Sequence, residues 1–291
     1  TPGIEAPGIG NILFPQVDLA TSDSWDQVTG RLVTSYQMTD VDMFFASYST
    51  GYKSGGFDSL TPSTTSFAPE ETANFEFGYK GIIADSVVAN VSAYYLELTN
   101  LQRTVSSKQP DQANAIPTII NEDRDITGIE FDLRWAVNDS LTLGFMTEIR
   151  QTDSNSPSFY NGEGTLIDPT TKTTDPTQNM TLTFDLAPEI STGMLNVHID
   201  YVFRENTNSD IVGLEDYKKS VAEFFTDYKN LSGRISWTDD EERYELGLWA
   251  KNITDERYVN SIGGYAAEVL GTPYARINRG REIGLDFKVN F

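Results

Sequence analysis

The chain offers few side chains that could carry out catalysis or hold a metal ion. It has one histidine, His198, and no cysteine, so there is no thiolate and little imidazole for a zinc site. His198 and Asp200 are two residues apart and would share one face of an extended strand. A serine on that face, Ser232 or Ser236, could complete the nucleophile, base and acid of a hydrolase. The sequence therefore allows a Ser–His–Asp arrangement, and it predicts no metal site and no cofactor.

Two acidic runs, 121–125 and 239–242, could supply oxygen ligands to a calcium ion. Neither run alternates its ligands around a central glycine, as a calcium-binding loop does. We therefore expect both runs to be solvated charge at the rim of the fold.

The run from Gly51 to Phe57 combines glycines with a cation and aromatic rings. One interpretation is a loop in which Tyr52, Lys53 and Phe57 meet an anionic or aromatic chelate. The other is a strand end whose glycines serve backbone geometry alone. It is not a phosphate loop, because no Lys-Ser or Lys-Thr pair follows its last glycines. Rings exposed in long polar loops are further ligand candidates, namely Phe159, Tyr160, Tyr217 and Tyr265.

Composition excludes several classes of protein. The 291 residues carry 43 acidic and 21 basic side chains, a net charge of −22, which argues against binding to nucleic acid phosphates. Aromatic residues make up 12%, more than a disordered acidic chain would hold. No run approaches the roughly 18 apolar residues that a membrane-spanning helix needs. The segment from Thr1 to Gly8 lacks the basic and apolar regions of a signal peptide.

Apolar and polar residues alternate along the whole chain, which predicts an all-β fold. The clearest case is the C-terminal run 282–291, in which every second residue from Ile283 to Phe291 is apolar. Many of the predicted strands are longer than the about 9–11 residues that a tilted strand needs to cross a membrane. Eleven strands are predicted, at 25–38, 41–52, 67–83, 85–104, 119–137, 139–153, 175–187, 190–206, 223–238, 242–255 and 279–291.

The predicted connections alternate between short turns and long polar loops. Such alternation is typical of an antiparallel transmembrane β-barrel, with tight turns on the periplasmic rim and long loops outside. The apolar face would then meet outer-membrane lipid and the polar face would line the lumen. His198, Asp200 and the candidate serines belong to the lumenal face, whereas a barrel lipase needs its nucleophile toward lipid. We therefore expect no enzyme activity.

Several runs resemble the β-barrel of TonB-dependent outer-membrane receptors, in the order in which that family carries them. They cover 25–291 and end on a terminal phenylalanine. The matching runs are Trp25–Leu32 (WDQVTGRL), Ala46–Phe57 (ASYSTGYKSGGF), Phe67–Glu70 (FAPE), Asn74–Lys80 (NFEFGYK), Ala93–Tyr95 (AYY), Leu101-Gln102 and Lys251–Tyr258 (KNITDERY).

The resemblance implies a barrel of about 22 strands, filled by an N-terminal plug through which the TonB complex acts. The implied function is uptake of a scarce nutrient, most often a ferric siderophore, across the outer membrane of a Gram-negative bacterium. We expect this chain to supply the C-terminal half of the barrel, without the plug and without its TonB contact, so that the missing half or another chain closes it. Residues 1–24 would be the remnant of an extracellular loop and 25–291 the barrel strands.

Three alternatives remain open from the sequence. The chain could form a pore independent of TonB, a surface-binding barrel without transport, or a receptor for a cargo other than iron, such as a glycan or cobalamin. Independently of these, the terminal pattern resembles the signal that the barrel assembly machinery recognises by strand addition. Its residues are Leu285, Phe287, Val289 and Phe291.

Overall fold

The computed structural model of the chain describes residues 4–6, 10–12, 20–58, 66–110, 115–162, 164–168, 173–205, 224, 226–262 and 274–290. Tyr217, Tyr265 and Phe291, which the sequence nominated as site residues, lie outside this part of the chain.

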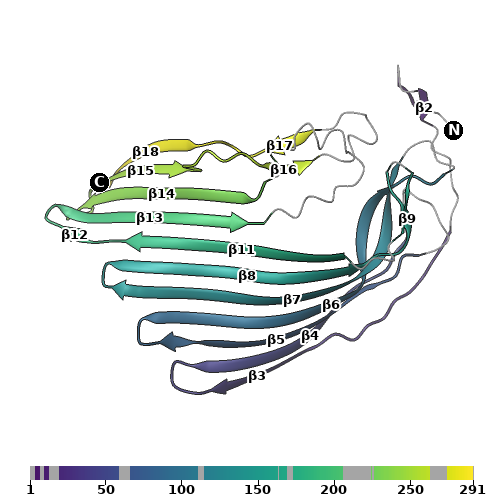
Figure 1. Ribbon diagram of the computed structural model, residues 1–291, viewed down its shortest axis with the longest axis horizontal. Helices are drawn as coiled ribbons and strands as arrows, with labels where there is room; N and C mark the ends of the chain where they lie inside the picture. Colours follow the sequence, from purple (N-terminus) through teal and green to yellow (C-terminus); the bar gives the residue numbers. More distant parts are fainter. Residues whose placement is uncertain are drawn as a thin grey trace.

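One antiparallel sheet dominates the described residues (Figure 1). Along its main path each strand pairs with the strands before and after it, as in an up-and-down barrel wall. The eleven strands predicted from alternation are all present, so the all-β, antiparallel prediction is confirmed. They are β3 (Arg31–Gln37), β4 (Met43–Lys53), β5 (Glu70–Ile83), β6 (Val87–Ser107), β7 (Ile116–Asn138), β8 (Leu141–Asn155), β11 (Thr173–Leu186), β13 (Gly193–Arg204), β14 (Tyr228–Asp239), β15 (Tyr244–Lys251) and β18 (Glu282–Val289).

Seven short strands accompany the main path. The two-residue strand β12 (Glu189–Ile190) pairs with β13 at its start. The others form three separate hairpins, which are β1 (Ile4–Ala6) with β2 (Gly10–Ile12), β9 (Phe159–Tyr160) with β10 (Leu166–Ile167), and β16 (Val259–Ile262) with β17 (Ala275–Ile277).

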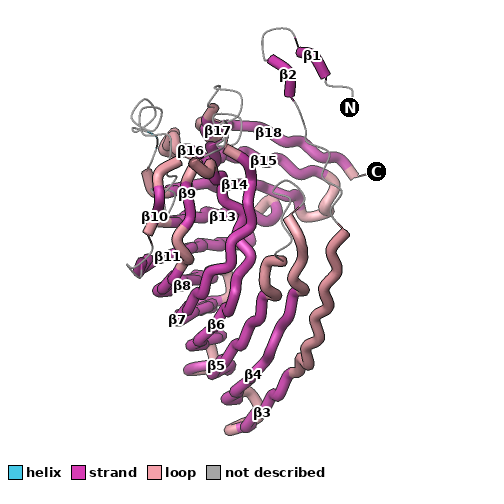
Figure 2. Tube along the Cα trace, turned by 90° about the vertical axis from the view of Figure 1, so that its right-hand side faces the viewer, coloured by secondary structure: helices cyan, strands magenta, loops and turns pink. Residues whose placement is uncertain are grey.

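The sheet is curved but open. Seen from the side, its strands follow an arc from β3 to β18, and these two strands do not pair with each other (Figure 2). Each therefore presents unpaired backbone groups along one edge, which hydrocarbon cannot satisfy. The prediction that these strands are part of a barrel wall, and do not close a barrel by themselves, is confirmed.

Short and long connections lie at opposite ends of the sheet, as predicted (Figure 1). At one end the strands turn within a few residues, and Ala84, Asp85 and Glu242 take positive φ angles of 51°, 59° and 55° to do so. The strand ends that the long connections join lie at the other end, as do the β9–β10 and β16–β17 hairpins, and in a transmembrane barrel this end is extracellular. Strands β6 and β7, with 21 and 23 residues, are the longest strands of the sheet.

The pairing register aligns apolar side chains in rows on one face. Ile235, Leu248 and Leu285 are direct neighbours on three adjacent strands, and they are 50%, 52% and 70% exposed. Only four apolar residues in the described chain are buried: Ala89, Val105, Ala115 and Val259. A one-layer sheet with such a face has no core of its own, and in a transmembrane barrel a face of this kind is the one that meets lipid. Among the described residues, no helix is long and apolar enough to cross a membrane.

Several aromatic side chains at the short-turn end of the sheet are exposed. Tyr36, Trp135 and Tyr244 lie near the short-turn end and remain exposed, as an interfacial girdle requires. The largest boundary error is at the first strand, which begins at Arg31 and not at residue 25. Residues 20–30 are extended without strand partners of their own, although the Thr50 amide donates to the Gly30 carbonyl at 3.0 Å.

Candidate functional site

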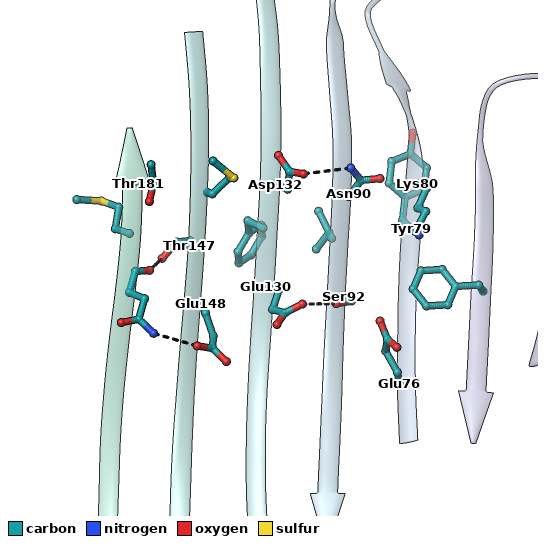
Figure 3. Close-up of a pocket in the computed structure, with 16 residues that line it drawn as sticks. Glu76, Tyr79, Lys80, Asn90, Ser92, Glu130, Asp132, Thr147, Glu148 and Thr181 are labelled. Carbon is teal, nitrogen blue, oxygen red and sulfur yellow. Dashed lines mark hydrogen bonds between the residues drawn. The ribbon is translucent and has the colours of Figure 1, made fainter. Parts of the chain in front are cut away.

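The concave, lumenal face of the sheet holds a polar hollow of about 550 Å³ between β5 and β11 (Figure 3). Four carboxylates face it, and we refer to Glu76, Glu130, Asp132 and Glu148 as the acidic patch. Glu130 and Glu148 are paired directly opposite each other on β7 and β8. Like charges at directly opposite positions destabilise a sheet, so this arrangement requires compensating partners.

The partners within the sheet only partly compensate the acidic patch. Glu148 accepts hydrogen bonds from Tyr94 at 2.7 Å and Asn179 at 3.0 Å, and lies 3.7 Å from the guanidinium of Arg150. Among the described residues, the one hydrogen bond to the Glu130 carboxylate is long, and it comes from the Ser92 hydroxyl at 3.4 Å. The patch therefore keeps a local excess of negative charge that faces the lumen.

A second lumenal network joins the last three strands of the sheet. Arg234 on β14 pairs with Glu245 on β15 at 2.9 Å and with Asp286 on β18. Trp249 also donates its indole N–H to Asp286, at 3.3 Å. These bonds cross three strands and tie β18 to the rest of the sheet, so they serve the wall of the barrel.

The possible hydrolase triad does not form. His198 Nδ1 lies 2.6 Å from Asp185, and Nε2 lies 3.7 Å from Asp200, so both ring nitrogens face carboxylates. The Ser232 hydroxyl donates to Asn230 at 2.6 Å and not to the imidazole. A nucleophile must be bonded to its base. The described residues also bring together no cluster of three acidic, histidine or cysteine side chains able to hold a metal.

The acidic run 121–125 lies within β7, and the expectation of solvated rim charge is wrong for Glu122. Its side chain is 2% exposed and is bonded to Arg103 at 2.8 Å, to Arg124, and to the Ser156 hydroxyl at 2.7 Å. The sequence could not show this, because Arg103 reaches Glu122 only after a β-bulge shifts the β6–β7 register between Leu98 and Leu101.

The predicted ligand residues of the first loop have separate surroundings. Lys53 shares the lumenal face of β4 and lies 3.9 Å from Glu70, whereas alternation places Tyr52 on the opposite face. Phe57 packs against Trp25, with ring centroids 6.5 Å apart. A Cβ added at Gly55 would lie 2.7 Å from the Trp25 ring, so this glycine permits close packing.

The predicted rings of the middle loop also have partners. Arg103 lies over the Phe159 ring at 5.6 Å, and Tyr160 pairs with Leu166 in the β9–β10 hairpin. Phe159 is therefore part of the cluster around Glu122. The structure does not bring Tyr52, Phe57 and Phe159 into one site, and their binding role remains a prediction.

The structure brings together three residues that the sequence does not link. We refer to Arg204, Tyr228 and Tyr258 as the rim cluster. Arg204 ends β13 and Tyr228 begins β14, and the register makes them direct partners. The Arg204 guanidinium lies 5.3 Å from the Tyr228 ring centre. The rings of Tyr228 and Tyr258 meet edge to face at 4.7 Å. Burial, followed by the neighbouring Tyr228, raises the pKa of Tyr258 to about 12, so its hydroxyl stays neutral at physiological pH.

Two buried amides hold the motif that follows β15. Asn252 donates to the carbonyls of Glu256 and Arg279 at 2.9 and 3.1 Å. Asn278 accepts from the Tyr258 amide at 3.0 Å and donates to the same two carbonyls. The run 251–258, noted in the sequence for its resemblance alone, is thus a locked turn that positions Tyr258 at the extracellular end.

Comparison with known proteins identifies the architecture. The family model described as TonB dependent receptor-like, beta-barrel, matches residues 13–253. The pesticin receptor of Yersinia pestis is 21% identical over 277 residues, which is 91% of this chain and 36% of that protein. This chain thus spans about a third of the curated relatives that it matches.

Solved structures share the fold at low sequence identity. The ferric yersiniabactin uptake receptor FyuA from Yersinia pestis superposes with a TM-score of 0.63 at 17% identity, covering 91% of this chain and 37% of that one. The siderophore receptor PiuA from Acinetobacter baumannii superposes with a TM-score of 0.57 at 17% identity, covering 90% and 35%. The chain belongs to the TonB-dependent receptor family, as part of its β-barrel, and the family consists of transporters and not enzymes.

Proposed function

We propose that this chain is the C-terminal part of the barrel of an outer-membrane receptor that takes up a ferric siderophore or a similar iron complex. The family match over 13–253 carries the proposal. The printed functions of FyuA and PiuA, which concern a ferric chelate and a siderophore, support an iron cargo here. Residues 25–291 would supply the wall and binding loops, and 1–24 would belong to an extracellular loop.

The lumenal charges support a plug as the partner inside the barrel. Glu130 and Glu148 oppose each other, and the acidic patch has few cations of its own. A plug with basic side chains would neutralise this patch and would carry the contact to the TonB complex. The edges of β3 and β18 require further strands, from the rest of the same protein or another chain, and the apolar face requires outer-membrane lipid.

Growth assays test this function directly. A Gram-negative host that depends on the complete receptor should grow on one ferric complex as its sole iron source. It should lose that growth when either the receptor or TonB is deleted. Growth on every ferric complex after receptor deletion would refute iron uptake. Rescue of growth on cobalamin or a glycan would establish the alternative cargo, and TonB-independent conductance would establish a pore.

A further inference from the structure

We infer that Arg204, Tyr228 and Tyr258 form a binding subsite for an anionic aromatic group, such as a catecholate or phenolate ring, at the extracellular end of the lumen. This inference rests on the proposed function and specifies the ligand chemistry of that receptor. It concerns residues other than those nominated from the sequence.

The position of the rim cluster suits a first contact with a solute. Arg204 shares its strand face with His198 and Asp200, and Tyr228 shares its face with Ser232, so the cluster opens toward the lumen. It also lies where β13 ends and β14 begins, at the end of the sheet that carries the long loops (Figure 1). A solute entering from outside would meet it before the acidic patch.

The groups of the rim cluster suit a planar anion. Tyr228 and Tyr258 meet edge to face, with an interplanar angle of 66°. The guanidinium of Arg204 lies over the face of Tyr228. Arginine is planar, stacks on aromatic rings and donates in a fork that matches two oxygens of a planar anion.

The charge of the rim cluster also favours an anion. Arg204 is exposed and forms no ion pair with a carboxylate in the described chain, whereas Arg234 on the same face is paired with two. The carboxylate of the adjacent Glu205 is not paired with Arg204. It accepts a hydrogen bond from the main-chain amide of Gln178 at 3.0 Å. In a chain of net charge −22, Arg204 thus supplies a local positive site that a negatively charged ring can use.

The rim cluster is held in place before any ligand arrives. The Asn230 amide donates to the Tyr228 hydroxyl at 3.1 Å. The main-chain amide of Tyr258 donates to the side-chain oxygen of Asn278. The main-chain amide of Asn278 in turn donates to the Tyr258 carbonyl at 3.1 Å. A preorganised site loses less entropy on binding than a flexible loop does.

The test compares two ferric probes on the complete receptor in detergent. The first is ferric 2,3-dihydroxybenzoate, which is aromatic and anionic, and the second is ferric acetohydroxamate, which has no aromatic ring. We expect the first to bind at least about ten-fold more tightly, since a charge-assisted bond to Arg204 is available only to it. Arg204→Gln should abolish most of this difference, and Tyr228→Phe should reduce it while keeping the ring.

Lys229 provides a matched control. It neighbours Tyr228 but points to the opposite face of β14, so Lys229→Gln removes one positive charge nearby without changing the lumen. The Lys229→Gln variant should bind the two probes with the same affinity ratio as the wild type. Equal binding of both probes to the wild type, or equal effects of Arg204→Gln and Lys229→Gln, would overturn the inference. If growth on ferric complexes still requires the receptor in that case, the proposed function stands without this subsite.

Discussion

Replacing Ser156 with alanine should release the β9–β10 hairpin while leaving the large sheet folded. The Ser156 hydroxyl donates to the Glu122 carboxylate at 2.7 Å, and this carboxylate is almost fully shielded from water. A hydrogen bond to a charged group contributes about 1.5–3 kcal/mol. Because about 1.4 kcal/mol is a factor of ten in an equilibrium, local opening should become about ten-fold to one-hundred-fold more frequent.

Hydrogen–deuterium exchange of the Lys108 amide measures this opening. The amide donates to the Asn161 carbonyl at 3.0 Å and is protected only while the hairpin lies against the end of β6. Ser158→Ala is the control, since the Ser158 hydroxyl meets Asp168 at 3.5 Å, the limit of a hydrogen bond. In the Ser158→Ala variant, the exchange rate of the Lys108 amide should change by less than about two-fold.

Glu122→Gln extends the test to the charge itself. Breaking a buried ion pair costs about 3–5 kcal/mol, but Arg103 and Arg124 are 39% and 31% exposed and can turn toward water. The loss should therefore lie near the lower end of that range, at about 3 kcal/mol, and exceed the loss caused by Ser156→Ala. Equal exchange at Lys108 in the Ser156 and Ser158 variants would refute the conclusion that Glu122 holds the hairpin.

Three further outcomes are expected. Asn278→Ala should leave the backbone groups that Asn278 satisfies without partners, at a cost of about 1–3 kcal/mol. Protease cleavage between residues 252 and 281 should therefore increase, and resistance equal to that of the wild type would contradict this. Hydrogen bonds, chiefly from Thr39, hold the pKa of Asp42 below its usual 3.8, so the turn is stabilised above that pH and loses this stabilisation as the pH falls through the lowered pKa. Thr39→Ala should move the Asp42 pKa upward in an NMR titration, and an unchanged titration would argue against this network. Deleting Phe291 should lower outer-membrane insertion of the complete receptor, measured by heat-modifiable mobility and surface protease accessibility.

Much of the fold could be predicted from alternation alone. A residue pattern with period two has one solution that buries its apolar face, so all eleven strands of the main path follow from local sequence. Connection lengths then decided which strand ends lie together. Boundaries were less certain: residues 25–30 have strand-like composition, but they are extended without partners of their own, and pairing begins at Arg31.

The candidate site depended on contacts between distant segments. The sequence predicts Phe57 and Phe159 as ligand-binding rings, but Trp25 and Arg103 pack against them. Such contacts join loops or strands whose separation in sequence carries no periodic signal. Composition can suggest that a ring is unusual in a loop, but it cannot show what covers that ring.

The sequence by itself determined the architecture, because hydrophobic periodicity is a local property that each strand expresses independently. Only the tertiary structure decided which side chains meet across strands. Arg204 and Tyr228 are separated by a long loop and become partners through register, and Glu122 is buried because a bulge lets Arg103 reach it. Register and bulges are set jointly by all paired strands and their turns, so no single segment encodes them.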